Sequence, residues 1–101
     1  MPTVLVTSAC VEFRETLARH IKQLQREDPE RHSLEWFFLR YLQRVASRAH
    51  ASPSAREVNG AMRGLTRFYV DAVAEDAALT ARFDDVLAAH RHALRTEQSG
   101  Q

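Results

Sequence analysis

The sequence contains few of the residues that cross-link or interrupt a fold. Its 101 residues include one cysteine, three glycines and three prolines. A single cysteine excludes an internal disulfide, and a chain of this length buries roughly 60–65% of its unfolded surface, enough for a core without cross-links. No apolar run approaches the ~18 residues that a membrane span requires. Together with the lack of a charged-then-apolar leader, these features predict a cytoplasmic protein that contacts no membrane.

The charges are nearly balanced overall but unevenly distributed along the chain. The formal net charge is +1, and Lys22 is the only lysine among the basic residues. Residues 1–70 hold eleven basic and seven acidic groups, whereas residues 71–101 hold three and six. A dipolar surface of this kind fits a charged protein partner better than a polyanion. The abundance of arginine and alanine is typical of GC-rich bacteria, and we expect a bacterial source.

Hydrophobic periodicity predicts an all-helical chain. Apolar residues recur at steps of three and four, and this pattern predicts helices over about residues 8–27, 30–49, 54–74 and 77–95. Asp28-Pro29 ends the first helix and offers an N-cap and a first residue for the second. Ser54 and Glu57 match a capping box for the third helix, and Asp76 can cap the fourth.

The connections between these helices are short, which favours antiparallel neighbours. We therefore expect residues 1–101 to form one all-α domain, an up-down-up-down four-helix bundle. Residues 2–7 are apolar and β-branched but too few for a sheet, which predicts a short extended N-terminal arm against the bundle. The polar residues 96–101 are expected to fray.

Residues capable of chemistry do not form a recognisable catalytic pattern. The sequence has no nucleophile–base pair, phosphate-binding loop or paired-carboxylate motif, so we predict a protein without enzymatic activity or cofactor. His20 and His90 fall within apolar stripes, but antiparallel first and fourth helices leave them roughly 9–10 Å apart along the bundle axis. That separation disfavours a shared metal. A metal- or cofactor-binding bundle that uses these histidines or Cys10 remains the alternative.

The second predicted helix carries large side chains on two faces. Its core stripe is formed by Leu34, Phe37, Phe38, Tyr41, Leu42, Val45 and Ala49. Trp36 and Leu39 point about 120–180° away from the centre of that stripe, beside Arg40 and Gln43. Because Trp and Arg are enriched in interface hot spots, these four residues form the first predicted partner-binding surface. Alternatively, the N-terminal arm folds over Trp36 and Leu39.

The third predicted helix contains Gly60 and Gly64 on the face opposite its apolar stripe, near Arg63 and Arg67. Each glycine inside a helix costs about 1 kcal/mol relative to alanine, so a close approach to the backbone would explain the pair. A second copy of the chain, giving a homodimer, or an anionic group held by the arginines would fit. These four residues form the second predicted binding surface; the alternative is an exposed face without a function.

A basic ridge follows the second predicted helix. Arg40, Arg44 and Arg48 succeed one another at four-residue steps. Such a ridge can contact phosphates, which makes a nucleic-acid-binding regulator a further candidate. The near-neutral net charge and the lack of a helix-turn-helix glycine turn disfavour that candidate.

Several short segments follow one another along the chain. The first are His20-Ile21, Asp28-Pro29-Glu30-Arg31 and Trp36-Phe37-Phe38. Further along come Asn59, Arg63, Leu65 and the run from Glu75 to Leu79. These segments resemble the CowN family, whose third-helix and acidic segments are similar in order. The likeness spans about residues 17–87. That family has cysteines near both ends of the chain, whereas this sequence has only Cys10. The resemblance implies a regulatory helical protein that sustains nitrogenase activity, and so nitrogen fixation, in the presence of carbon monoxide by contacting the enzyme.

Overall fold

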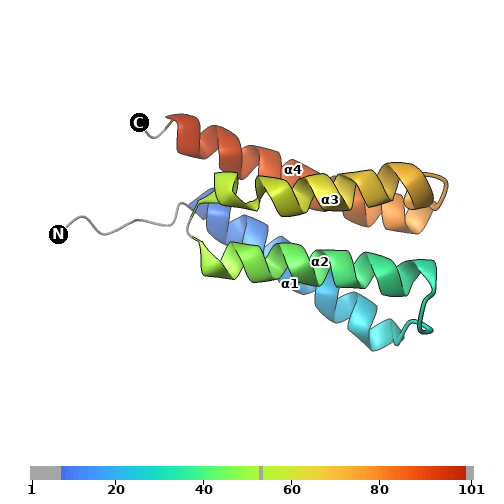
Figure 1. The fold of residues 1–101 in the computed structure, drawn as a ribbon. Coiled ribbons are helices and arrows are strands. Elements are labelled where there is room, and N and C mark those ends of the chain that lie inside the picture. Colours follow the sequence, from blue (N-terminus) through green and yellow to red (C-terminus); the bar gives the residue numbers. More distant parts are fainter. Residues whose placement is uncertain (1–7, 53, 100–101) are drawn as a thin grey trace.

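The structure is a computed structural model that describes residues 8–52 and 54–99. Within them the chain forms four α-helices, one short 3₁₀ helix and one π-helical turn, and no strand. The elements are α1 (Ser8–Glu27), α2 (Leu34–Ala51), η1 (Ala55–Val58), α3 (Asn59–Phe68), η2 (Tyr69–Val73) and α4 (Ala77–Ser99). The helices run alternately up and down, so the predicted all-α four-helix bundle is confirmed (Figure 1). The arm expected over residues 2–7 lies outside the described residues.

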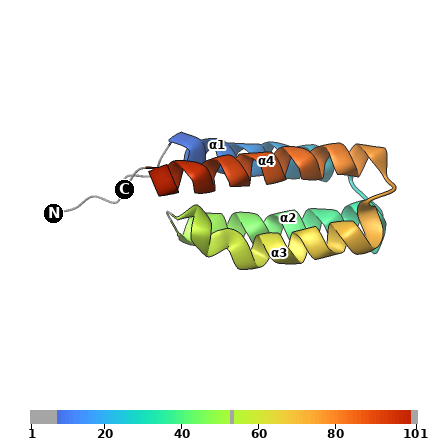
Figure 2. The same ribbon diagram turned by 90° about the horizontal axis from the view of Figure 1, so that it is seen from above.

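The four helices pack in two layers. α1 and α4 lie side by side in one layer, and α2 and α3 lie side by side in the other (Figure 2). α1 packs extensively against both α4 and α2, and α2 also packs against α3. α4 meets the segment 55–73 chiefly through η1 and η2, the short elements at the two ends of α3. Three seams between neighbouring helices are therefore closely packed, whereas the seam between α3 and α4 is more open.

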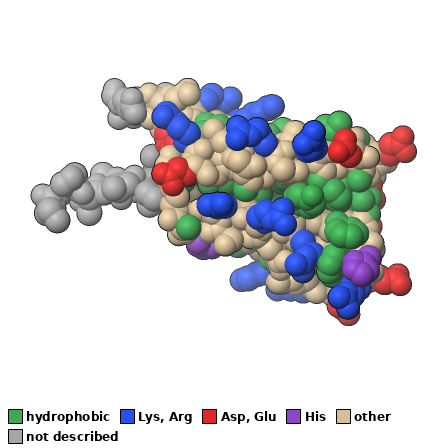
Figure 3. All heavy atoms as spheres, in the orientation of Figure 1, with side chains coloured by type: hydrophobic (Ala, Val, Ile, Leu, Met, Phe, Trp, Pro, Cys, Tyr) green, Lys and Arg blue, Asp and Glu red, His purple; other side chains and the backbone are tan. Residues whose placement is uncertain are grey.

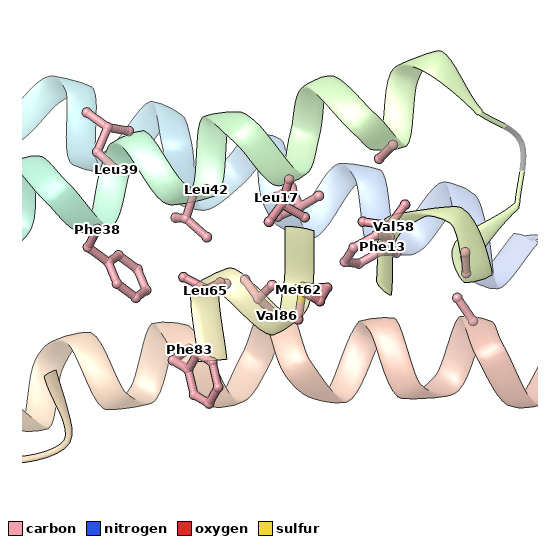
Figure 4. Packing of buried hydrophobic residues seen from close by; sticks show 14 of the residues in the cluster. Phe13, Leu17, Phe38, Leu39, Leu42, Val58, Met62, Leu65, Phe83 and Val86 are labelled. Atoms are coloured by element: carbon pink, nitrogen blue, oxygen red, sulfur yellow. The ribbon is translucent and has the colours of Figure 1, made fainter. Parts of the chain in front are cut away.

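Apolar side chains from both layers fill the space between them. Fully buried examples are Phe13, Leu17, Phe38, Leu42, Leu65 and Val86. Figure 4 shows these side chains succeeding one another along the bundle axis. Each buried side chain of this size stabilises the fold by about 1.5–3 kcal/mol. The periodicity predicted for the first helix is also seen, because buried residues of α1 recur at steps of three and four. They include Cys10, Phe13, Leu17, His20 and Leu24.

The joint between α1 and α2 differs from the prediction. We expected Asp28 to cap the second helix with Pro29 in its first turn, but α2 begins at Leu34 with Ser33 as its N-cap. The Ser33 side chain accepts a hydrogen bond from the backbone N–H of Trp36 at 3.2 Å, which satisfies an otherwise unpaired amide and fixes the helix start. Asp28 instead closes α1 with a φ of 48°, a left-handed conformation that aspartate tolerates better than most residues.

The helix expected over residues 54–74 is divided into η1, α3 and η2. Ser54 caps η1 as predicted, because its side chain accepts from the backbone N–H of Arg56 at 3.3 Å. The carboxylate of the predicted capping box comes from a different residue. Glu97 of α4, rather than Glu57, accepts hydrogen bonds from the Ala55 N–H and the Ser54 hydroxyl. A carboxylate that is distant in sequence therefore holds the start of the third helical segment.

The fourth helix begins as predicted and ends later than predicted. Asp76 Oδ1 accepts a hydrogen bond from the backbone N–H of Leu79 at 2.9 Å, as an N-cap does. We expected the helix to end near residue 95 and the tail to fray, but α4 continues to Ser99. The contacts of Glu97 with η1 explain the extension, because they hold this last turn against the bundle.

Among the helices described, none combines the length and the apolarity that a membrane crossing demands.

Candidate partner-binding surfaces

An aromatic cluster lies at the surface where α2 begins. The rings of His32, Trp36 and Phe37 contact one another, with centroid distances between 4.9 and 5.9 Å. The Arg40 guanidinium carbon lies over the Trp36 ring, 4.8 Å from its centroid. We call these four residues the aromatic patch. Figure 3 shows apolar, histidine and arginine side chains gathered at this end of the α2–α3 face. A cation–π contact stabilises by about 0.5–1 kcal/mol at exposed sites and orients both side chains.

Two residues of α2 differ from the prediction in whether they are buried or exposed. Leu39, assigned to the outward surface, is only 8% exposed and belongs to the core shown in Figure 4. Phe37, assigned to the core, is 39% exposed. The four large apolar residues from Trp36 to Leu39 cover about 300° of a helical turn, so the helix cannot bury all of them. Because α2 packs against both α1 and α3, its buried arc extends to Leu39 and leaves Phe37 outside.

The backbone before α2 adopts an uncommon conformation at His32. Its φ is 68°, in the left-handed region, which costs about 1–2 kcal/mol for a residue other than glycine. The neighbouring Ser33 N–H donates to the Glu30 carbonyl at 2.9 Å, which closes the turn. Backbone strain of this kind persists where the surrounding structure fixes it, often at functional sites. Here it places the His32 ring against Trp36 and Phe37.

The aromatic surface continues from α2 onto α3. Tyr41 stacks on Phe68 with a centroid distance of 4.7 Å and an interplanar angle of 17°. The Arg44 guanidinium carbon lies over the Tyr41 ring at 5.3 Å. Together with Arg40 over Trp36, two arginines one helical turn apart each cover an aromatic ring. The arginines of α2 and the aromatic side chains therefore form one continuous surface.

The predicted basic ridge is present on the outer side of α2. Arg40, Arg44 and Arg48 are exposed, and with Gln43 and Ser47 they border a shallow hollow of about 370 Å³. Gln43 of the first predicted surface is thus exposed beside Arg40. Within residues 8–52 and 54–99, none of the three arginines forms an ion pair. Their charges are therefore available to a partner.

Gly60 and Gly64 do not mark a close approach within the bundle. A Cβ added at Gly64 would meet Tyr41 Cε1 at 3.9 Å, and a Cβ added at Gly60 would meet Arg63 Nη2 at the same distance. Both are ordinary van der Waals distances, so the part of the chain that the structure describes leaves room for alanine at either position. The close contact with another chain stays a prediction.

Arg63 and Arg67 of the second predicted surface border a groove between α3 and α4. The groove has a volume of about 620 Å³. Its lining residues are Asn59, Met62, Arg63, Gly64, Thr66, Arg67 and His90. No residue of the aromatic patch is among them. The groove and the aromatic patch therefore share no residue, although Gly64 also lies beside Tyr41, and Gly60 borders a hollow with Arg44 and Arg48.

No family model, curated protein or solved structure matches this chain. The resemblance to the CowN family stays a prediction. The function of the protein is therefore inferred from the surfaces that its helices form.

His20 joins α1 to α4 through hydrogen bonds from both ring nitrogens. Its Nε2 lies 2.7 Å from Asp85 Oδ2, and its Nδ1 lies 3.1 Å from Arg82 Nη1. Because a guanidinium can only donate, the Nδ1 accepts and the Nε2–H donates to the carboxylate. The hydrogen bond from His20 holds the pKa of Asp85 below its ordinary value. Both nitrogens of this ring are thus engaged in contacts between helices.

His90 and Cys10 are likewise buried in the bundle. The His90 Nε2–H donates to the Ala55 carbonyl at 3.0 Å, and burial lowers the pKa of His90, so its ring is neutral at pH 7. Burial raises the pKa of the Cys10 thiol, which disfavours the thiolate that nucleophilic or metal-binding chemistry uses. Among the described residues, no three His, Cys, Asp or Glu side chains are grouped to hold a metal ion. The observed contacts give both histidines a structural role.

Proposed function

We propose that this protein is a small non-catalytic binding module that docks onto a partner protein through the aromatic patch. The observation that carries the proposal is the contact between the exposed ring of Phe37 and the partly exposed ring of Trp36, with Arg40 stacked over the indole. Trp and Arg dominate interface hot spots because large rings release much water and a guanidinium adds directed hydrogen bonds. The rings already pack against one another, so a partner that covers them orders few additional side chains.

The partner surface is acidic around an apolar centre. Glu35 is the only acidic residue of α2, whereas Arg40, Arg44 and Arg48 extend along its exposed side. Guanidinium groups recognise carboxylates through paired hydrogen bonds, and such charges accelerate encounter at low ionic strength. A protein surface that mixes acidic and apolar side chains complements arginines lying over aromatic rings better than a phosphate backbone does.

The nitrogenase complex is the first partner to test. The resemblance to the CowN family supports this choice. In that role the protein binds the enzyme and modulates or protects it in the cytoplasm, without chemistry of its own.

The substitution Trp36→Ala tests the proposed surface. We expect it to weaken binding to the nitrogenase complex by about 30-fold, the effect of removing a hot-spot side chain worth ~2 kcal/mol. Val11→Ala is the matched control, because Val11 is an apolar residue of α1 that is 41% exposed and lies outside the aromatic patch. Biolayer interferometry measures the affinities, and circular dichroism establishes that both variants remain helical.

Full affinity of the Trp36→Ala variant would contradict the proposed surface. If the unsubstituted protein does not bind nitrogenase, the three proteins are immobilised and exposed to an extract of the source cells. A protein that the unsubstituted chain and Val11→Ala retain, and that Trp36→Ala loses, is then the partner. If no protein shows that pattern, docking through Trp36 is wrong.

A further inference from the structure

The groove between α3 and α4 has walls that are fixed at both ends. At the η1 end, the Ala55 N–H donates to Glu97 and the Ala55 carbonyl accepts from His90. Two residues of α4 therefore bond the backbone of Ala55. At the η2 end, Tyr69 stacks on Phe83 of α4 with a centroid distance of 4.1 Å and nearly parallel rings. Between these two anchors α3 lacks an extensive backbone contact with α4. The groove is therefore preformed, which lowers the entropic cost of filling it.

The buried side chains that line the groove are uncharged. Met62 and His90 line it and are both almost fully buried. The methionine thioether adapts its shape to apolar groups. The imidazole is neutral because burial lowers the pKa of His90. Its Nε2–H is committed to the Ala55 carbonyl at 3.0 Å, so the Nδ1 can only accept a hydrogen bond.

The rim of the groove is cationic. Arg63 and Arg67 are exposed and stand one helical turn apart, which brings their side chains within about 5–6 Å of each other at Cβ. Neither forms an ion pair with any residue that the structure describes. Two arginines one helical turn apart on the border of a groove that Met62 also lines are complementary to an acid group attached to an apolar body.

We propose that the α3–α4 groove binds an amphipathic organic anion, with its acid group between Arg63 and Arg67 and its apolar body over Met62 and His90. The volume of about 620 Å³ falls within the range of roughly 300–1,000 Å³ for small-molecule sites. Asn59 and Thr66 of the lining offer further hydrogen bonds to the acid group. This site is distinct from the aromatic patch, so it stands whether or not the protein docks through Trp36.

Decanoate is a suitable probe because it joins one carboxylate to a flexible apolar chain. In ¹H–¹⁵N NMR titrations below its micelle concentration, we expect saturable shifts concentrated at residues 59–67 and at His90. Decyltrimethylammonium has the same chain and the opposite charge, and it is expected to bind at least about tenfold more weakly. Saturable shifts centred on Trp36 and Phe37, equal binding of the cation, or no saturable shift would overturn the proposal.

Two variants separate the rim from the rest of the groove. The double substitution Arg63→Gln with Arg67→Gln is expected to weaken decanoate binding at least about tenfold. Arg26→Gln is its control, since Arg26 is an exposed arginine of α1 remote in sequence from the groove lining, and it is expected to bind as the unsubstituted protein does. Thr66→Trp fills the groove while keeping both arginines and is expected to abolish binding, with circular dichroism as the check of folding. Unchanged affinity in the double variant, or in a folded Thr66→Trp variant, would sink the assignment.

Discussion

His90 makes the stability of this fold depend on pH in a direction that follows from its burial. The residue is 4% exposed, and burial lowers the pKa of His90 below the ordinary value of 6.5. The unfolded chain therefore takes up the proton at a higher pH than the folded chain does. The contribution of neutral His90 to the free energy of unfolding is complete above pH 6.5. It is lost as the pH falls from there toward the folded-state pKa of His90. The loss is at most about 1.4 kcal/mol per pH unit, the value for one proton.

The substitution His90→Gln isolates this effect. A glutamine amide keeps an N–H donor for the Ala55 carbonyl but does not titrate. Between pH 7 and 5.5 we expect the unfolding free energy of the unsubstituted protein to fall by up to about 1 kcal/mol and that of the variant to fall less. Urea unfolding followed by circular dichroism measures both. His92→Gln, at an exposed position of the same helix, is the matched control and is expected to keep the full pH dependence.

The test lies in the slope of stability against pH rather than in its absolute value. Glutamine also loses the ring contact between His90 and Phe13, whose centroids are 5.2 Å apart, so the variant is expected to be less stable at every pH. Parallel pH profiles for His90→Gln and the unsubstituted protein would refute the reasoning. They would show that the folded and unfolded chains bind the His90 proton equally.

Three further substitutions test the helix ends and the seam between α1 and α4. Arg14 donates to the carbonyls of Ala49 and Ser52 at 3.1 and 2.9 Å, so Arg14→Met is expected to lower the unfolding free energy in urea by about 2 kcal/mol. Asp76→Ala removes the N-cap of α4 and is expected to cost about 1 kcal/mol in the same assay; unchanged midpoints would contradict both assignments. Because the pKa of Asp85 is lowered, its contribution is complete above pH 3.8 and is lost as the pH falls through the folded-state pKa. Asp85→Asn is therefore expected to flatten the stability profile below pH 4, and an equally steep profile would count against the lowered pKa.

The number of helices and most of the core could be predicted because both depend on local periodicity. An apolar residue at every third or fourth position makes one helical face apolar, whatever that face later contacts. The buried residues Phe13, Leu17 and Leu24 of α1 follow this pattern. Asp76 was also predictable as a cap, because its partner N–H lies only three residues away in the chain.

Contacts between residues distant in sequence could not be predicted in this way. Glu97 replaced Glu57 at the start of η1, because a carboxylate from α4 reaches the Ala55 amide in the folded bundle. Similarly, Ser33 rather than Asp28 became the cap of α2. Both residues have the right chemistry for a cap, so residue type alone does not distinguish them.

The candidate site was predicted in part. Arg40 and Gln43 are exposed on α2 and Trp36 is partly exposed, whereas Leu39 is buried and Phe37 takes a place in the aromatic patch. Four large apolar residues in succession indicated that at least one had to face outward, but they did not indicate which one. His32 was missed because its contribution depends on a left-handed backbone in the loop before α2.

The sequence by itself determined four amphipathic helices, their antiparallel order and the presence of large aromatic and arginine side chains on α2. Only the tertiary structure decided which of those side chains remain exposed and that α3 stands away from α4. The reason is physical: periodicity specifies the apolar face of one helix, whereas burial depends on the neighbours that flank it on both sides. α2 has α1 on one flank and α3 on the other, and their positions place Leu39 inside the bundle and Phe37 on its surface.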